Sequence, residues 1–256
     1  MNGKNLILLV GQSNMSGRGF LTENDIYEIP GLTAIRRDFE WIPAIDPFNF
    51  DRLNLLGLND SQDPFEVRGL TIGDKRRCGV GPGRTFGKLF LEKFSDHPVG
   101  LIPASIGGTP IASWLPGGKD PHSEAHPYDD ALVLARKAME QGEIVAVLWH
   151  QGESDANSHT ENYKEKLQTV IANFRNDLDL HHVPFILGGL GDFLDASWNA
   201  ETYNQMIRQV ANETPLAGFA SAENLVDRGD KLHFDTASQY ILGARYFAEY
   251  CRITGK

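Results

Sequence analysis

A serine, a histidine and an aspartate, the residue types that together make a serine hydroxyl reactive, occur at suggestive places in the chain. Ser13 follows the apolar run LILLV and one glycine, in the segment GQSNMSG. His233 lies near the other end of the chain, and Asp230 precedes it by three residues in DKLHFD. Because a serine hydroxyl is a weak nucleophile, it needs a base within reach and an acid that orients this base. The sequence offers one candidate for each role.

Each of these residues also has an ordinary structural explanation. A serine after a first strand is often a helix cap or a loop residue. Asp230 can cap its own turn while His233 packs in the core, and Asp-x-x-His is a common pattern. Glu153, which follows a glycine, suits the first turn of a helix, where a carboxylate is favoured by the helix dipole. The chemistry therefore depends on whether the fold brings these residues together.

Short apolar runs, separated by stretches with helical spacing, predict the elements that must position them. LAGFAS at 216–221 is the weakest of these runs. The others, typical of strands buried on both faces of a sheet, lie at 5–10, 99–103, 144–149 and 183–189. The alternation predicts an α/β fold, a three-layer α/β/α sandwich with a mainly parallel central sheet of about five strands. We interpret residues 1–256 as a single domain, with a loop-rich excursion at about 36–83.

Helices are expected from the spacing of apolar side chains between these runs. One covers about 86–94, one about 200–212, and the last follows Asp235. Another covers 167–178, behind a capping-box pattern of Ser158 and Glu161.

Polar segments follow three of the apolar runs at the point where each strand is expected to end. They are GQSN at 11–14, ASIGGT at 104–109 and HQGES at 150–154, and Asp230 and His233 come after the fifth run. Because parallel strands end at one edge of a sheet, ligands bind in the crevice at that edge. The joint occurrence of these segments predicts one site there.

Several other kinds of site do not match the sequence. The elbow of an α/β-hydrolase needs a second glycine where Met15 stands. His181 and His182 are adjacent and not spaced as helical metal ligands, so no metal is expected. GQSNMSGRG lacks the Gly-Lys-Ser/Thr ending of a phosphate-binding loop.

Composition excludes some partners. A formal net charge of −10 opposes binding to nucleic acid or to an anionic membrane. No apolar run is long enough to span a bilayer, and LILLV is too short for the core of a signal peptide. We therefore expect a cytoplasmic protein, or the mature form of a secreted one. Cys78 and Cys251 form no CxxC pair, and two unpaired thiols are expected in preference to a disulfide.

The combination of GQSNMSG, IPASIGGTPIASW, WHQGESDA and DKLHFD resembles the SGNH-type hydrolases. More narrowly, it is similar to their acetylesterase branch, which contains carbohydrate esterase family 6 and the sialate O-acetylesterases. GVGPGRTFGKLF at 79–90 and WIPAIDP at 41–47 extend the resemblance over nearly the whole chain in the same order. The resemblance implies a flavodoxin-like SGNH hydrolase fold. It also implies a serine esterase that removes O-acetyl groups from carbohydrates without a metal or an organic cofactor.

The resemblance also implies residue roles. Ser13 would be the nucleophile and His233 the base, oriented by Asp230. The backbone N–H groups of Ser13 and Gly108, with Gly107 as the alternative to Gly108, would bind the oxyanion.

Two residues of HQGES at 150–154 complete the expected site. Gln151 stands where the wider superfamily has an asparagine, and its side-chain amide would be the third oxyanion donor; the acetylesterase branch shares this difference. Glu153 is either the acidic partner of His233 or a residue that holds Gln151 and its loop. We favour Asp230 as the partner because it is close to His233 in sequence.

The expected substrate is an acetylated xylan fragment or an O-acetyl sialic acid. Gln12 and Asn14, on either side of the serine, are candidate substrate-binding residues, and so is Trp114. Trp41 and Trp198 are further surfaces on which a sugar could stack. Two alternatives remain at this point: a non-catalytic carbohydrate-binding or regulatory module on the same fold, and a flavodoxin-like protein that binds a cofactor phosphate at residues 11–17.

Overall fold

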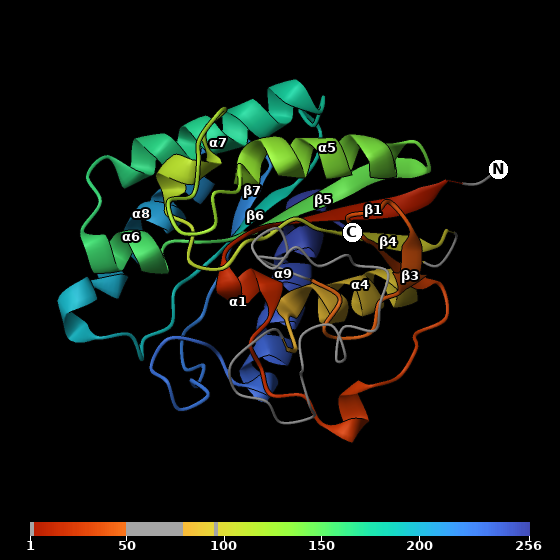
Figure 1. Cartoon of the computed structure of the whole chain (residues 1–256), viewed down its shortest axis with the longest axis horizontal. Coiled ribbons are helices and arrows are strands. Elements are labelled where there is room, and N and C mark those ends of the chain that lie inside the picture. The colour runs from red at the N-terminus through yellow and green to blue at the C-terminus, as the bar shows by residue number, and fades with distance from the viewer. Residues whose placement is uncertain (1–2, 50–78, 95–96) are drawn as a thin grey trace.

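The first strand, β1, lies at the centre of a seven-stranded sheet with the order β3-β2-β4-β1-β5-β6-β7 (Figure 1). The computed structural model describes residues 3–49, 79–94 and 97–256. The strands are β1 Lys4–Gly11, β2 Leu32–Ile35, β3 Trp41–Pro43, β4 Val99–Pro103, β5 Gly142–His150, β6 Phe185–Gly188 and β7 Ala217–Ala220. Every pairing is parallel except that of β2 with β3.

Helices cover both faces of this sheet, which confirms the predicted three-layer α/β/α architecture (Figure 1). They are α1 Ser13–Ser16, α4 Pro82–Lys93, α5 Pro127–Met139, α6 Glu153–Ser158, α7 Tyr163–Asp177, α8 Ala200–Glu213 and α9 Thr236–Thr254, with 3-10 turns η1 Glu23–Asp25, η2 Ile111–Trp114 and η3 Ala196–Trp198. Successive side chains of β1 point to opposite faces of the sheet, so they pack alternately under the two helical layers. Leu6 and Leu8 pack in the core under α5, α7 and α8, whereas Ile7 and Leu9 pack in the core under α4 and α9.

The five predicted strands are present, and the sheet has two more, β2 and β3. Both are too short for a period of two to show in the sequence: β2 has four residues and β3 has three. β3 falls within the stretch 36–83 that we interpret as an excursion, and Pro43 ends it. A proline is tolerated at this place because β3 is an edge strand. Most of that stretch, with Cys78, lies outside the described residues.

The helix predictions are confirmed except at one start. The predicted capping box is wrong, because α7 begins at Tyr163 and Ser158 is the last residue of a separate short helix, α6. Asn162 precedes α7 with a left-handed backbone (φ 57°) and no side-chain cap. By contrast, α9 begins as expected after Asp235, whose carboxylate accepts a hydrogen bond of 2.7 Å from the backbone N–H of Ser238.

The order of the strands explains why the polar segments meet. β1 is followed along the chain by strands on one side, and from β5 onward the chain continues on the other side. The crevice beside β1 is therefore the switch point of the sheet, where α/β proteins bind ligands. Backbone hydrogen bonds join the three segments there. Gln12 N donates to His150 O (2.8 Å), and Ile106 N donates to Gly11 O (2.9 Å).

Gly11 permits this close approach, and we expect Gly11→Ala to destabilise the protein. Gly11 has φ 125°, and an added Cβ would overlap the carbonyl group of His150. We expect the free energy of unfolding to fall by about 2–4 kcal/mol, measured by urea denaturation. Gly117→Ala is the control, because Gly117 also has a positive φ (70°) but open space around it. If both variants lost the same free energy of unfolding, the clash with His150 in β5 would not be the cause of the loss.

Two further expectations concern membrane spans and thiols. Among the described residues, no helix is long and apolar enough to cross a membrane. Cys251, on α9, is a free, half-buried thiol.

Candidate active site

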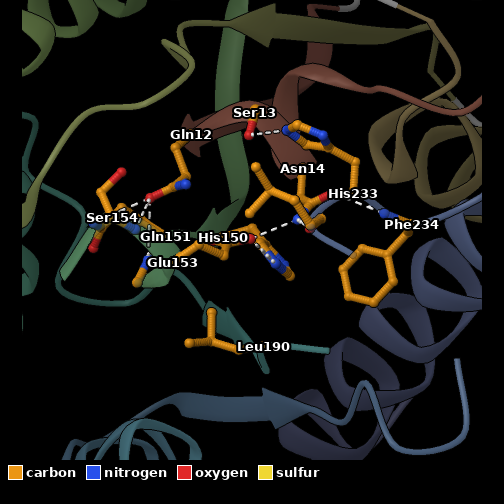
Figure 2. Close-up of polar contacts among 12 residues, drawn as sticks. Gln12, Ser13, Asn14, His150, Gln151, Glu153, Ser154, Leu190, His233 and Phe234 are labelled. Carbon is orange, nitrogen blue, oxygen red and sulfur yellow. Dashed lines mark hydrogen bonds and ion pairs between the residues drawn. The ribbon is translucent and has the colours of Figure 1, made fainter. Parts of the chain in front are cut away.

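Ser13, His233 and Asp230 form one hydrogen-bonded chain at the end of β1. Ser13 is the first residue of α1, directly after β1, and His233 lies in the turn before α9. His233 Nε2 is 2.9 Å from Ser13 Oγ, a contact between residues 220 positions apart (Figure 2). His233 Nδ1 is 2.8 Å from Asp230 Oδ2. The structure therefore brings together the three residues that the sequence nominated.

Asp230 organises the turn that carries His233. Its Oδ1 accepts hydrogen bonds from the backbone N–H groups of His233 (2.8 Å) and Leu232 (3.0 Å). Its Oδ2 accepts from His233 Nδ1 and also from Arg228 Nε, at 2.6 Å. Burial alone would raise the pKa of Asp230, but the hydrogen bonds from His233 and Arg228 hold this pKa well below its usual range. The carboxylate is therefore ionised, and His233 Nδ1 carries the proton that faces it.

The environment of His233 favours the neutral ring. Burial lowers the pKa of His233, and the charges of Arg18 and Arg228 lower it further. The hydrogen bond to Asp230 acts in the opposite direction, but the resulting pKa lies below the ordinary value for histidine. With its proton on Nδ1, the ring presents the lone pair of Nε2 to the hydroxyl of Ser13. This is the arrangement that a general base needs.

The backbone N–H groups of Ser13 and Gly108 are the two predicted main-chain donors to an oxyanion. Ser13 begins a helix, so its N–H has no partner within α1. Gly108 lies in the turn after β4 with φ 80°. Among the described residues, the N–H groups of Ser13 and Gly108 donate to no acceptor. Gly107, by comparison, makes an interaction of its own. Gly108 stays the predicted second oxyanion donor.

The side chain of Gln151 is already engaged in hydrogen bonds within the protein. Its Nε2 lies 3.1 Å from Thr109 O and 3.3 Å from Gln12 Oε1, and it also bonds Asp155 Oδ2. An amide nitrogen has two hydrogens, so these acceptors use both of them. Gln151 therefore ties the end of β5 to the segment after β4 in this structure. Its role as the third oxyanion donor stays a prediction.

Gln12 fixes the loop that follows β5. Its Oε1 accepts from Gln151 Nε2 and lies 3.4 Å from the backbone nitrogens of both Gly152 and Ser154 (Figure 2). The side chain is buried, and its carbonyl oxygen faces the protein. In the described part of the chain, no acceptor binds its Nε2. Substrate binding by Gln12 stays a prediction, and only this nitrogen is available for it.

Glu153 does not contact His233. Its Oε1 accepts a hydrogen bond of 2.5 Å from Asn14 Nδ2 and lies 3.3 Å from His150 Nε2. Burial raises the pKa of Glu153, but the hydrogen bonds from His150 and Asn14 bring it below the ordinary value. Of the two carboxylates considered from the sequence, Asp230 is thus the one that contacts the imidazole of His233.

Two predicted substrate contacts are wrong. Trp114 is fully buried, with Nε1 donating to Thr109 Oγ1 (3.0 Å) and its ring packed edge-on against Trp149. A sugar cannot stack on a ring that the core covers. Asn14 is also buried, and both ends of its amide bond the protein. Of the other tryptophans, Trp41 and Trp198 are half-buried, and Lys4 Nζ lies 4.5 Å from the ring centre of Trp41.

Sequence reasoning missed Arg228. Besides its bond to Asp230, Arg228 donates through Nη1 to the carbonyl oxygen of Arg18 (2.9 Å). It therefore joins the turn of His233 to the segment just after α1. Its position two residues before Asp230 was a signal, but arginine in such a turn is common. The described ranges contain no group of three or more His, Cys, Asp or Glu side chains placed to hold a metal ion.

A protein-family model described as carbohydrate esterase, sialic acid-specific acetylesterase, matches residues 3–252. The chain belongs to this family. It is therefore a carbohydrate O-acetylesterase, as the resemblance of its motifs predicted.

Individual relatives agree with this family. The esterase is 28% identical over 267 residues to probable carbohydrate esterase At4g34215 of Arabidopsis thaliana, which covers 96% of this chain and 91% of that protein. It is 29% identical over 104 residues to the sialate O-acetylesterase of Homo sapiens, which covers 35% of this chain and 20% of that protein.

Solved structures show the shared fold. The Arabidopsis thaliana protein aligns over 98% of both chains with a TM-score of 0.75 and 24% identity. The crystal structure of NanS aligns over 100% of this chain and 99% of that chain, with a TM-score of 0.71 and 14% identity. These alignments show that both proteins share the sandwich built around β1.

Proposed function

We propose that the esterase removes O-acetyl groups from carbohydrates by a serine mechanism, with Ser13, His233 and Asp230 in the three catalytic roles. The observation that carries the proposal is the unbroken chain of hydrogen bonds from Asp230 through His233 to the hydroxyl of Ser13. The ionised carboxylate keeps the proton on Nδ1, so Nε2 is free to accept the proton of Ser13.

The reaction follows from these positions. Ser13 Oγ attacks the carbonyl carbon of the acetyl group while His233 Nε2 takes the hydroxyl proton. The N–H groups of Ser13 and Gly108 bind the oxygen that becomes negative. The imidazolium of His233, stabilised by Asp230, then gives its proton to the departing sugar hydroxyl and leaves Ser13 acetylated. Water, deprotonated by Nε2, attacks the acetyl-serine, and acetate leaves as the proton returns to Ser13 Oγ.

Gln151 would join this step by a local exchange. To donate to the oxyanion, its amide must release Thr109 O or Gln12 Oε1. Both are neutral acceptors and therefore bind the amide more weakly than the carboxylate of Asp155 does. The bond to the carboxylate of Asp155 would remain and would hold the other hydrogen.

The name of the family supports a substrate class. Its description specifies sialic acid, and one relative is a sialate O-acetylesterase. O-acetyl sialic acid is therefore the first carbohydrate to test, and acetylated xylo-oligosaccharides are the second.

Acetate release from these two substrates and from p-nitrophenyl acetate tests the proposal. We expect turnover of p-nitrophenyl acetate and of at least one of the two carbohydrates. If the protein binds acetylated sugars by calorimetry but releases no acetate from any of the three esters, it is a binding module instead.

The pH dependence of the reaction reports the base. Because His233 must be neutral to accept a proton, kcat/KM should fall as the pH falls through the pKa of His233. The positive charge of Arg228 lowers that pKa, and Arg228 and His233 bind the same oxygen of Asp230. In Arg228→Gln, the pKa of His233 should rise, and the acid limb of the kcat/KM profile should move to higher pH.

Lys231→Gln is the matched control, because it removes a positive charge from the same turn without removing a side-chain contact to Asp230. Its acid limb should stay within experimental error of the wild-type limb. An acid limb that stays in place or moves to lower pH in Arg228→Gln would contradict this account.

A further inference from the structure

Asn14 holds the chain on both sides of His233. Its Nδ2 donates to the carbonyl oxygen of Leu232 (3.2 Å), and its Oδ1 accepts from the N–H of Phe234 (3.2 Å; Figure 2). Leu232 and Phe234 are the residues before and after the histidine. Because Asn14 also follows Ser13 directly, one amide ties the backbone of the base to the backbone of the nucleophile.

Glu153 determines which way this amide faces. An asparagine amide that turns over exchanges its donor and its acceptor. Glu153 Oε1 lies 2.5 Å from Asn14 Nδ2, and an ionised carboxylate can only accept. The turned amide would place two oxygens against each other, and it would lose both bonds that bracket His233. The carboxylate therefore selects the orientation that holds Leu232 and Phe234.

His150 keeps Glu153 ionised. The hydroxyl of Tyr246 donates to Trp149 O (2.7 Å), so it can only accept from His150 Nδ1, which lies 3.2 Å away. His150 Nδ1 therefore carries a hydrogen. Its Nε2 faces Glu153 Oε1 at 3.3 Å. Burial raises the pKa of Glu153, but this contact and the hydrogen bond from Asn14 bring that pKa below its ordinary value.

The pair of His150 and Glu153 is enclosed by the core. His150 is 0% exposed, and Glu153 and Asn14 are each 1% exposed. A side chain on Gly188 would overlap the ring of His150 and the hydroxyl of Tyr246, so this glycine leaves the space that they occupy. A buried carboxylate is stable only while the groups that contact it stay in place. It acts here as a rigid support under Asn14.

We propose that Asn14 is a positioning residue for His233 and that the His150–Glu153 pair sets the orientation of its amide. The inference rests on the proposed function, because it assigns these residues to the placement of the catalytic base. It explains why a buried carboxylate lies near the site without contacting the imidazole of His233.

The first experiment compares Asn14→Ala with Asn204→Ala. Asn204 is another buried asparagine that binds backbone on both sides, at Leu190 N (2.7 Å) and Leu190 O (3.0 Å), away from His233. We expect kcat for p-nitrophenyl acetate to fall about 100-fold in Asn14→Ala with little change in KM, because the base is misplaced. In Asn204→Ala, kcat should stay within about threefold of wild type, because Asn204 bonds Leu190 and not the chain around His233.

A fluorophosphonate probe separates this inference from the proposed function. Its reaction at Ser13, followed by mass spectrometry, needs the nucleophile and the base but no sugar recognition. We expect labelling of the wild-type protein at Ser13 and labelling about 100-fold slower in Asn14→Ala. Equal labelling rates in Asn14→Ala and Asn204→Ala would overturn the inference and leave the proposed function intact. A wild-type protein that is not labelled at Ser13 would overturn both.

A second test exchanges the donor and the acceptor between positions 14 and 153. It applies even if Asn14→Ala does not fold. Asn14→Asp places two carboxylates together and should lower the labelling rate about 100-fold. Adding Glu153→Gln lets the new amide donate to the new carboxylate, which can still accept from Phe234 N although it cannot donate to Leu232 O. We therefore expect a partial recovery of the rate, by about tenfold. A double variant no faster than Asn14→Asp would contradict the role of Glu153.

Discussion

Ser13→Ala should lower the rate of acetate release from p-nitrophenyl acetate by at least about 10⁴-fold, the scale of loss when a catalytic serine is removed. The reason is geometric: the hydroxyl of Ser13 lies 2.9 Å from His233 Nε2, within reach of the base. The substitution removes a single oxygen and leaves α1 and its backbone N–H groups in place, so KM should change little.

Ser16→Ala is the matched control. Ser16 lies in the same short helix, and its buried hydroxyl bonds Gln12 O (3.4 Å) and Ser105 Oγ (3.1 Å), with no contact to His233. Its rate should stay within about tenfold of wild type, whatever its effect on stability. If Ser13→Ala retained activity comparable to Ser16→Ala, the nucleophile would be another residue.

Asp230→Asn should cause the second largest loss, about 10³–10⁴-fold in kcat. The carboxylate accepts from His233 Nδ1 and from three further donors, which are Arg228 Nε and the backbone N–H groups of Leu232 and His233. An amide can present its NH₂ group to His233 and so favour the tautomer with the proton on Nε2. That tautomer cannot accept the proton of Ser13, and the imidazolium would also lose its counter-charge.

Glu153→Gln is the comparison that tests the assignment of the acid. Glu153 contacts His150 and Asn14 but not the ring of His233, so its replacement should cost at most about 100-fold, the scale of a misplaced base. Steady-state kinetics of the two variants, with circular dichroism to check folding, decide between the carboxylates. A larger loss in Glu153→Gln than in Asp230→Asn would reverse the assignment.

The parts of the site that could be predicted from the sequence are those set by local rules. Asp230 and His233 meet because a turn of three residues with a preceding glycine folds the carboxylate onto the ring. Ser13 is placed at the edge of the sheet, where His233 can reach it, because β1 ends at Gly11 and a short helix begins at Ser13. The long buried strands show as apolar runs, whereas β2 and β3 are too short to show any period.

The roles of individual polar side chains depend on partners far away in the sequence. Asn14 and Glu153 are 139 positions apart, and nothing local distinguishes Asn14 as a support for the base from Asn14 as a substrate contact. Trp114 is of the residue type on which sugars stack, but its ring packs against Trp149 in the core.

The sequence by itself determined the α/β class, the strand ends at which the candidate site lies, and Ser13 and His233 as candidate nucleophile and base. The tertiary structure alone decided which carboxylate faces His233 and where the amides of Gln12, Asn14 and Gln151 point. The physical reason is the range of the interactions. Periodicity and turns act between near neighbours, whereas a buried hydrogen bond is directional and its partner is known only once the strands are placed side by side.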